Sequence, residues 1–301
     1  MELRKSFLHC SLLIVYCSLF ILSCTTLSQI EGPAASPEQV SPLWMPLHVS
    51  GLTGDLTSGL EYFAGKISRP RIEFHALRID LNAPNLRIVV SPGGDDGGKT
   101  VSIRVSSFVR DKDLLAGINA LPFDTVSGAE GEPRINVGLV IADGVMLSPP
   151  HKTFDALVFY KDGRAAIAAQ SEISDHDSGS IENAVGGFYR ILEHGELAPR
   201  VLNINDRHPR SAAGISSDSR FLYLLVIDGR QIKSAGGTEA ETALILRALG
   251  AYDAINFDGG GSSAMALRCP DNTVRVVNTP IQDQIPGRER AVAGCLGIGN
   301  R

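Results

Sequence analysis

The chain has 301 residues and is 44% apolar, so it can bury a substantial core without metal or disulfide support. Its formal net charge is -5 and its sequence pI is near 5.8. Proteins that bind nucleic acid through its phosphates present a basic surface, so we expect no nucleic-acid partner.

Residues 1–23 are predicted to form an export signal. Arg4 and Lys5 precede an apolar run at 7–22, which is short for a membrane-spanning helix and is followed by no second run of that length. The run ends in the letters ILSC, which is similar to the lipobox of bacterial lipoproteins. We therefore expect Cys24 to be lipidated, and the protein to be exported and held by this lipid at the bacterial cell envelope, periplasmic or at the surface. An ordinary signal peptide cleaved nearby is the alternative.

Past Cys24 the composition changes. Residues 24–46 are rich in serine, proline and small residues and are interpreted as a flexible tether, so the folded domain is predicted to span 47–301. Cys269 and Cys295 fall in that domain, and the sequence leaves a disulfide and two buried thiols as alternatives.

The domain begins with short apolar runs separated by turn residues, which favours strands over helices. Alternation of apolar and polar residues predicts strands at 74–80 and 85–91. Two hairpins follow, each around an Asp-Gly turn, with strands predicted at 137–141 and 145–147, and at 156–160 and 165–168. The middle of the chain is therefore expected to be antiparallel.

A strand–helix–strand unit is predicted after the hairpins. Its first strand covers 221–227, and its helix begins at Thr238, which has capping-box spacing to Glu241, and stops at Gly250. The second strand, at 254–257, leads directly into the sequence DGGGSS. These elements predict an α+β domain of mixed, largely antiparallel sheets with a few helices, in which the strand–helix–strand unit ends in a glycine-rich loop.

This loop, at 258–263, is the strongest chemical signal in the sequence. Three consecutive glycines after a buried strand cost chain entropy unless the backbone turns sharply or approaches a ligand. Their amides and the hydroxyls of Ser262 and Ser263 are donors suited to phosphate or sugar oxygens. A tight turn without a ligand is the alternative. The sequence has no P-loop or dinucleotide-binding pattern, and no histidine follows Ser262 to complete a serine-hydrolase triad.

Several blocks of the chain together resemble the phosphodiester glycosidase family. They are RSAAG at 210–214, VIDGR at 226–230, the helix that contains Glu241, NFDGGGSS at 256–263, GIN at 117–119, VNTP at 277–280 and RERAV at 288–292. The resemblance covers most of the chain beyond about residue 74. One departure is ALPF after Asn119, where the family has a glycine pair and an aromatic residue. This departure bears on the substrate more than on the fold.

The resemblance implies hydrolysis of a sugar 1-phosphodiester at the glycosidic bond, which releases the sugar and a phosphomonoester. Such a reaction needs a carboxylate beside the anomeric carbon, as nucleophile or as base for water, and positive charge around the phosphate. The candidate catalytic residues are Asp258, Glu241 and Asp228. The candidate substrate-binding residues are Asn119, Arg210, Arg230, Gly259, Gly260, Gly261, Ser262, Ser263 and Arg290.

Local roles compete with some of these assignments. Glu241 is also the second half of the predicted capping box, Asp228 is the first residue of an Asp-Gly turn, and Asn119 can bond its own backbone. Arg210 is the expected phosphate clamp, because its planar guanidinium group can hold two oxygens at once.

Two other functions stay open. One is a non-catalytic surface lipoprotein of the same fold that binds carbohydrate or phosphate, and the other is attack on phosphorus, which typically needs metal ligands. The acidic clusters at 95–96 and 175–177 are interpreted as solvated loops and His151 as a surface histidine. We therefore assign no metal and no cofactor, although a divalent metal stays open. The expected substrate is a glycan of the cell envelope or of a host, and the oligomeric state is undetermined.

Overall fold

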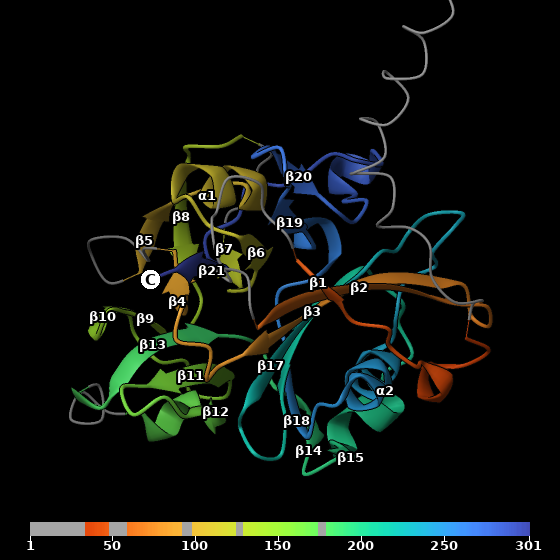
Figure 1. Ribbon diagram of the computed structural model, residues 1–301, viewed down its shortest axis with the longest axis horizontal. Helices are drawn as coiled ribbons and strands as arrows, with labels where there is room; N and C mark the ends of the chain where they lie inside the picture. Colours follow the sequence, from red (N-terminus) through yellow and green to blue (C-terminus); the bar gives the residue numbers. More distant parts are fainter. Residues whose placement is uncertain (1–33, 48–58, 92–97, 125–128, 174–178) are drawn as a thin grey trace, which may run out of the picture.

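The computed structural model describes residues 34–47, 59–91, 98–124, 129–173 and 179–301 (Figure 1). The predicted export signal and Cys24 lie outside the described residues. Within the described part of the chain, no helix is long and apolar enough to cross a membrane.

Part of the predicted tether is described, and it packs on the domain. Strand β1 (Met45–Pro46) pairs with the strand that begins at Leu60, and the ring of Trp44 meets Phe63 edge to face with centroids 5.9 Å apart. Val40 is buried in the same cluster. The folded unit therefore extends upstream of residue 47, because the apolar side chains of Val40 and Trp44 pack against the core.

The largest sheet has eight strands in the order β1-β2-β3-β17-β16-β18-β14-β15. Beyond β1, these are β2 (Leu60–Ile67), β3 (Ile72–Asp80), β14 (Arg190–Glu193), β15 (Glu196–Leu197), β16 (Arg210–Ile215), β17 (Phe221–Ile227) and β18 (Asp253–Asn256). Neighbouring strands pair antiparallel, so β17 and β18, which flank β16, run parallel to each other. Helix α2 (Glu239–Leu249) makes the connection between them, which confirms the predicted strand–helix–strand unit.

Two five-stranded sheets and a three-stranded sheet complete the fold. The first, in the order β10-β9-β13-β11-β12, consists of β9 (Val140–Ala142), β10 (Val145–Ser148), β11 (Asp155–Tyr160), β12 (Ala165–Ala169) and β13 (Ile181–Gly186). The second, in the order β20-β19-β6-β21-β4, consists of β4 (Leu86–Val90), β6 (Ala116–Asn119), β19 (Met265–Arg268), β20 (Val274–Val276) and β21 (Cys295–Asn300). The small sheet has β5 (Lys99–Val101), β7 (Phe123–Asp124) and β8 (Pro133–Asn136).

The predicted strands and the predicted fold class are confirmed. The expected strands at 74–80, 85–91, 221–227 and 254–257 correspond to β3, β4, β17 and β18 within two residues at each end. Both hairpins form, β9 with β10 and β11 with β12, and their turn glycines have φ of 79° at Gly144 and 87° at Gly163. Glycine is favoured there because a side chain is disfavoured at positive φ.

The best-predicted helix is α2. Thr238 and Glu241 make a complete capping box, and Gly250 ends the helix in the left-handed conformation with φ 117°. Helix α1 (Val105–Asp111) was not predicted, because it is short and its N-cap residue, Arg104, makes no capping bond through its side chain. Short 3-10 segments are η2 (Pro37–Gln39), η3 (Gln170–Glu172), η5 (Pro199–Asn203), η6 (Gly260–Ser262) and η7 (Gln282–Gln284).

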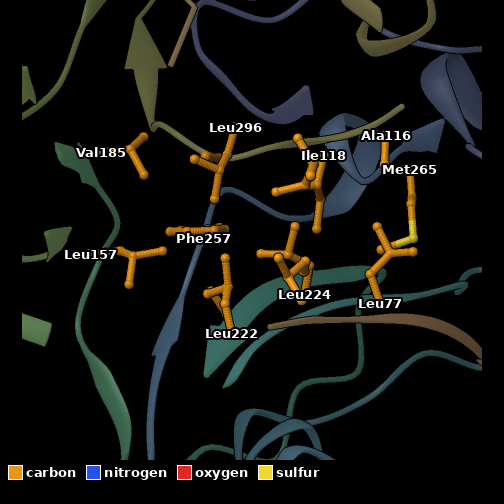
Figure 2. Packing of buried hydrophobic residues seen from close by; sticks show 14 of the residues in the cluster. Leu77, Ala116, Ile118, Leu157, Val185, Leu222, Leu224, Phe257, Met265 and Leu296 are labelled. Atoms are coloured by element: carbon orange, nitrogen blue, oxygen red, sulfur yellow. The ribbon is translucent and has the colours of Figure 1, made fainter. Parts of the chain in front are cut away.

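The main core lies where the three larger sheets meet (Figure 2). Leu77, Leu222 and Leu224 come from the eight-stranded sheet, Leu157 and Val185 from the β9–β13 sheet, and Ile118, Met265 and Leu296 from the β19 sheet. Helix α2 covers the opposite face of the eight-stranded sheet, and α1 packs on the β19 sheet (Figure 1). Apolar burial therefore joins the sheets into one unit.

The two cysteines of the domain lie in or beside the β19 sheet. Cys269 directly follows β19, and Cys295 begins β21, the strand between β6 and β4. Of the two alternatives that the sequence left open, the structure shows two buried thiols.

Candidate active site

The glycine loop joins two sheets. It leaves β18 in the eight-stranded sheet at Asp258 and enters β19 in the neighbouring sheet, passing through the 3-10 turn Gly260–Ser262. The Asp258 amide donates to the carbonyl of Ala120 at 2.9 Å, and the Gly260 amide donates to the carbonyl of Pro209 at 2.8 Å. These bonds fix the loop at the junction of the sheets.

Asp258 presents a half-buried carboxyl group at the start of the loop. Burial raises the pKa of this group to about 6, against the opposing effects of a hydrogen bond with Ser262 and the positive charge of Arg290. A carboxyl that changes charge near neutral pH while facing a guanidinium group is typical of catalytic sites. The predicted catalytic residue Asp258 is thus placed beside two predicted binding residues.

Two guanidinium groups flank the glycines. A Cβ on Gly260 would stand 3.3 Å from Nη2 of Arg230, and a Cβ on Gly261 would collide with the guanidinium group of Arg290. Arg290 donates through Nε to Gln282 Oε1 and through Nη1 to Ser262 Oγ at 3.2 Å. Arg230 is exposed, and its Nη2 lies 3.3 Å from His208 Nδ1. Two cations beside turning backbone amides form a site suited to a phosphate group.

Because the Arg290 group fills the space beside Gly261, we expect Gly261→Ala to displace it. The added methyl group should lower the free energy of unfolding by about 1–3 kcal/mol, and weaken phosphate binding as well. Gly179→Ala is the matched control, since a Cβ there meets nothing within 4 Å. Equal thermal unfolding curves and equal phosphate affinity for the two variants would contradict the placement of Arg290.

Arg210 lies close to the loop, but its guanidinium group faces the N-terminus of α2. Its Nε donates to the carbonyl of Gly237 at 3.0 Å, its Nη2 to the carbonyl of Asp206 at 2.9 Å, and its Nη1 lies 3.4 Å from Glu239 Oε1. Burial lowers its pKa, against the charge of Glu239. The guanidinium group of Arg210 therefore joins β16 to α2, and Arg210 adjoins Gly259 only through its Cα and Cδ. The guanidinium groups beside Gly260 and Gly261 are those of Arg230 and Arg290.

Asn119 is fully buried at the end of β6 and bonds only to protein groups among the described residues. Its Oδ1 accepts from Ser211 Oγ at 2.7 Å and from the Ala264 amide at 3.1 Å, and its Nδ2 donates to the carbonyl of Asp258 at 2.6 Å. It thereby supports the backbone under Asp258.

Asp228 is buried directly after β17. Its Oδ1 accepts from Asn278 Nδ2 at 3.1 Å and from the Thr279 amide at 2.8 Å, and Asn278 also donates to the carbonyl of Ser263. Burial raises the pKa of Asp228. It also lines a cavity of about 550 Å³, and no residue of the glycine loop is among the described residues around that cavity. Its contacts are those of a group that positions the end of the loop.

Glu241 carries out the capping role that competed with catalysis. Its Oε2 accepts from the Thr238 amide at 3.0 Å, and both carboxylate oxygens accept from Arg207 at 2.6 Å. We expect Glu241→Ala to lower the free energy of unfolding by about 1–2 kcal/mol through loss of the cap. A urea titration would check this, and an unchanged unfolding midpoint would contradict it.

The sequence did not single out several residues that surround these groups. Glu239 is buried at the first position of α2, Tyr189 donates to its Oε1 at 3.1 Å, and Gln282 holds Arg290. His208 is half-buried, and burial together with the charges of Arg210 and Arg230 lowers its pKa. Only the position of Glu239 in the first turn of a capped helix was visible in the sequence, and that position predicts a structural role.

The remaining candidates have local roles or fall outside the described residues. His151 is half-buried and stacks on Phe154 with ring centroids 3.8 Å apart. The acidic clusters at 95–96 and 175–177 lie outside the described residues. Within those residues, no three His, Cys, Asp or Glu side chains are grouped closely enough to hold a metal ion.

Comparison with known proteins identifies the family of the chain. The sequence model of the phosphodiester glycosidase family matches residues 112–299, a range that contains Asp258, Arg230 and Arg290. The chain belongs to the phosphodiester glycosidase family.

Similar proteins come from bacteria and from a vertebrate. The SPbeta prophage-derived uncharacterized protein YomE of Bacillus subtilis is 27% identical over 265 residues, which cover 83% of this chain but only 38% of YomE. The catalytic domain of the zebrafish N-acetylglucosamine-1-phosphodiester alpha-N-acetylglucosaminidase, solved in a form auto-inhibited by its pro-peptide, has a TM-score of 0.61 at 20% identity. That match covers 91% of this chain and 96% of the zebrafish domain. A hypothetical protein from Synechocystis has a TM-score of 0.58 at 14% identity, covering 81% of this chain and 62% of the other.

Proposed function

We propose that this member of the family hydrolyses a glycosyl phosphodiester at the glycosidic bond and releases a sugar and a phosphomonoester. The observation that carries the proposal is the position of the Asp258 carboxyl beside Arg290, in a loop whose glycines admit two guanidinium groups. The similar zebrafish domain is named as an N-acetylglucosamine-1-phosphodiester alpha-N-acetylglucosaminidase, which supports the same bond as the target.

The proposed groups match the demands of the reaction. The phosphomonoester is a good leaving group, so the site has to stabilise negative charge more than it has to protonate the departing oxygen. Arg290, Arg230 and the loop amides are suited to that task. Asp258 acts as a carboxylate, either attacking the anomeric carbon or taking a proton from the attacking water. In both routes the bond between the anomeric carbon and the phosphate oxygen breaks, and water supplies the new hydroxyl group of the sugar.

The test is hydrolysis in oxygen-18 water. The purified domain, 25–301, would be given the methyl phosphodiesters of glucose 1-phosphate and N-acetylglucosamine 1-phosphate. We expect the label in the released sugar and none in the methyl phosphate. Label in the phosphate would show attack on phosphorus. Binding of these compounds without turnover would favour the alternative of a surface protein that binds carbohydrate or phosphate.

The raised pKa of Asp258 predicts the pH dependence of this reaction. Because the carboxylate is the active form, kcat/KM should rise as the pH increases through about 6 and then level off. A steady-state pH profile of the natural domain measures this. A profile that falls as the pH increases through the same range would assign Asp258 as a general acid.

We also propose that the protein is exported and anchored through a lipid on Cys24, where it acts on an envelope or host glycan from the membrane surface. The support is the apolar N-terminal run followed by the lipobox-like sequence ILSC. Metabolic labelling with an alkyne fatty acid should mark the natural protein and leave Cys24→Ala unlabelled. Equal labelling of both would remove the proposed anchor.

A further inference from the structure

The α2-facing side of β18 carries polar groups at its C-terminal end. Ala254 packs against α2, and Asn256 lies on the same face because side chains alternate along a strand. Phe257 points into the central core on the opposite face. Asp258 continues the alternation, so it lies on the face of Asn256, about 7 Å beyond it along the strand direction. Asn256 and the reactive carboxyl thus share one face of the sheet.

Neighbouring strands and the helix bring three further polar groups to this face. The backbone of Asn256 pairs with Ala212 of β16 on one side and bonds Tyr189 on the other. Arg210, two residues before Ala212, extends to Glu239 in the first turn of α2, and the Tyr189 hydroxyl donates to the same Glu239 oxygen at 3.1 Å. Asn256 and Glu239 therefore lie on the side of the sheet that α2 covers, joined through Tyr189 and the β16 strand.

Each of these two residues has one acceptor atom that the protein leaves unused. Glu239 is 4% exposed and Asn256 is 3% exposed. Among the described residues, Glu239 Oε2 and Asn256 Oδ1 are buried and receive no hydrogen bond. Leaving a buried acceptor without a donor is unfavourable, so two such atoms close to an active site indicate that a ligand supplies the donors.

The charge around these atoms restricts the ligand. Arg210 contacts Glu239, Arg230 lies beside His208, and the Arg200 guanidinium carbon stands 3.2 Å from the centre of the Tyr189 ring. Three cations in this region disfavour a metal ion or an amine ligand. A neutral ligand that carries several O–H or N–H donors, as a sugar does, meets both requirements.

We propose that Glu239 and Asn256 recognise the sugar of the substrate, with Glu239 Oε2 and Asn256 Oδ1 accepting hydrogen bonds from its hydroxyl or amide groups. This inference rests on the proposed function and adds the position of the glycosyl residue. The phosphate then lies over the glycines with Arg290 and Arg230, the anomeric carbon over Asp258, and the sugar over the end of β18 toward α2. Tyr189, which bonds Glu239, and His208, which lies beside Arg230, are only half-buried.

The experiment compares the natural domain with Glu239→Gln and Asn256→Leu. Glutamine keeps an acceptor for Tyr189 and Arg210 but places an amide NH2 where Oε2 stood, and leucine removes the Asn256 acceptor at similar volume. Each protein would also carry Asp258→Asn, which blocks turnover, and isothermal titration would then measure binding of the methyl phosphodiester of glucose 1-phosphate and of its 2-, 3-, 4- and 6-deoxy analogues. Methyl phosphate alone would probe the phosphate end, and exposed Glu196→Gln is the control variant.

For the natural domain, we expect loss of the contacted hydroxyl to weaken binding about tenfold to a hundredfold. Each variant should bind the parent sugar phosphodiester about tenfold to a hundredfold more weakly than the natural domain does. Within one variant, the affinities for the parent compound and for the analogue that lacks the contacted hydroxyl should differ by less than about threefold. Methyl phosphate affinity should stay close to that of Glu196→Gln for both variants. Thermal unfolding should stay close to that of Glu196→Gln for Asn256→Leu, whereas Glu239→Gln should unfold at a lower temperature, because it removes the charge that faces buried Arg210. A merely structural role would weaken binding of all analogues equally and would not erase the discrimination.

The inference is overturned if both variants discriminate among the deoxy sugars as the natural domain does, or if no sugar phosphodiester binds more tightly than methyl phosphate. The second outcome would mean that the unused acceptors hold water only. Because titration measures affinity and not turnover, the two proposals fail separately. Selective binding without hydrolysis overturns the proposed reaction, and hydrolysis without the predicted selectivity overturns the sugar position.

Discussion

Asp258→Asn should lower kcat/KM for a sugar 1-phosphodiester by about 10²- to 10⁴-fold, the usual contribution of a proton-transfer or nucleophilic carboxylate. The amide has nearly the same shape but cannot accept a proton or attack the anomeric carbon. Phosphomonoester release, followed at pH 7 over a range of substrate concentrations, measures the effect. Asp111→Asn is the control, because its carboxylate lies at the exposed end of α1 and pairs only with Arg110 among the described residues.

The same substitution should stabilise the fold at neutral pH, which separates a lost function from a lost structure. Burial raises the pKa of Asp258 from 3.8 to about 6, so folding favours the protonated form and the natural protein loses stability as the pH rises through that window. Replacing the carboxylate should recover up to about 3 kcal/mol at pH 7. The gain should shrink as the pH falls toward 4 and vanish well below the unfolded pKa of 3.8, where the folded and the unfolded chain both hold the proton. If Asp258→Asn is active, or is less stable than the natural protein at pH 7, this account is contradicted.

Arg290→Ala should produce the second large effect. It removes a guanidinium group that bonds Ser262 and lies within the electrostatic range of Asp258. We expect kcat to fall about 10²- to 10³-fold, as it does when a group that stabilises transition-state charge is removed. Because the charge of Arg290 lowers the pKa of Asp258, the acidic limb of the pH profile should also move to higher pH.

The shift of that limb distinguishes Arg290 from an ordinary surface arginine. Arg290→Lys should keep the charge and therefore the pH profile, while losing part of the rate because lysine lacks the planar arrangement of donors. Arg288→Ala, two positions away, is the matched control, since its guanidinium group is half exposed and pairs with Asp283. Equal kinetics for Arg288→Ala and Arg290→Ala would show that Arg290 does not contact the substrate.

The sequence was sufficient for elements whose signals are local. The two Asp-Gly hairpins, the helix between Thr238 and Gly250 and the strand before the glycine loop depend on residues only a few positions apart. The order of the eight-stranded sheet was beyond reach, because β3 pairs with β17 across more than a hundred residues and no short pattern specifies that register. Helix α1 was missed for lack of a capping signal.

In the candidate site, too, the residues marked by local sequence signals were predicted, and those that depend on long-range contacts were not. The three glycines were predicted to belong to the site because consecutive glycines cost chain entropy unless the backbone turns sharply or approaches a ligand. Asp258 was predicted because it directly precedes them. The role of Arg210 was assigned differently by the structure, since its partners Gly237 and Glu239 are brought to it by the crossover through α2. The unused oxygens of Glu239 and Asn256 could not be seen in a sequence, because only the packed structure shows which buried atoms lack donors.

Because the loop bridges two sheets, the candidate active site is complete only after both sheets have formed. A chain that has been synthesised as far as Ser263 contains Asp258 and all of the loop glycines, but the strands β19, β20 and β21 and the arginine at 290 come later. Strand β21 enters the interior of its sheet, between β6 and β4, so that sheet closes late. Domains generally fold as units, so the carboxylate of Asp258 and the guanidinium group of Arg290 meet only after the second sheet has formed. A nascent or truncated chain should therefore carry the carboxylate without its counter-charge and remain inert.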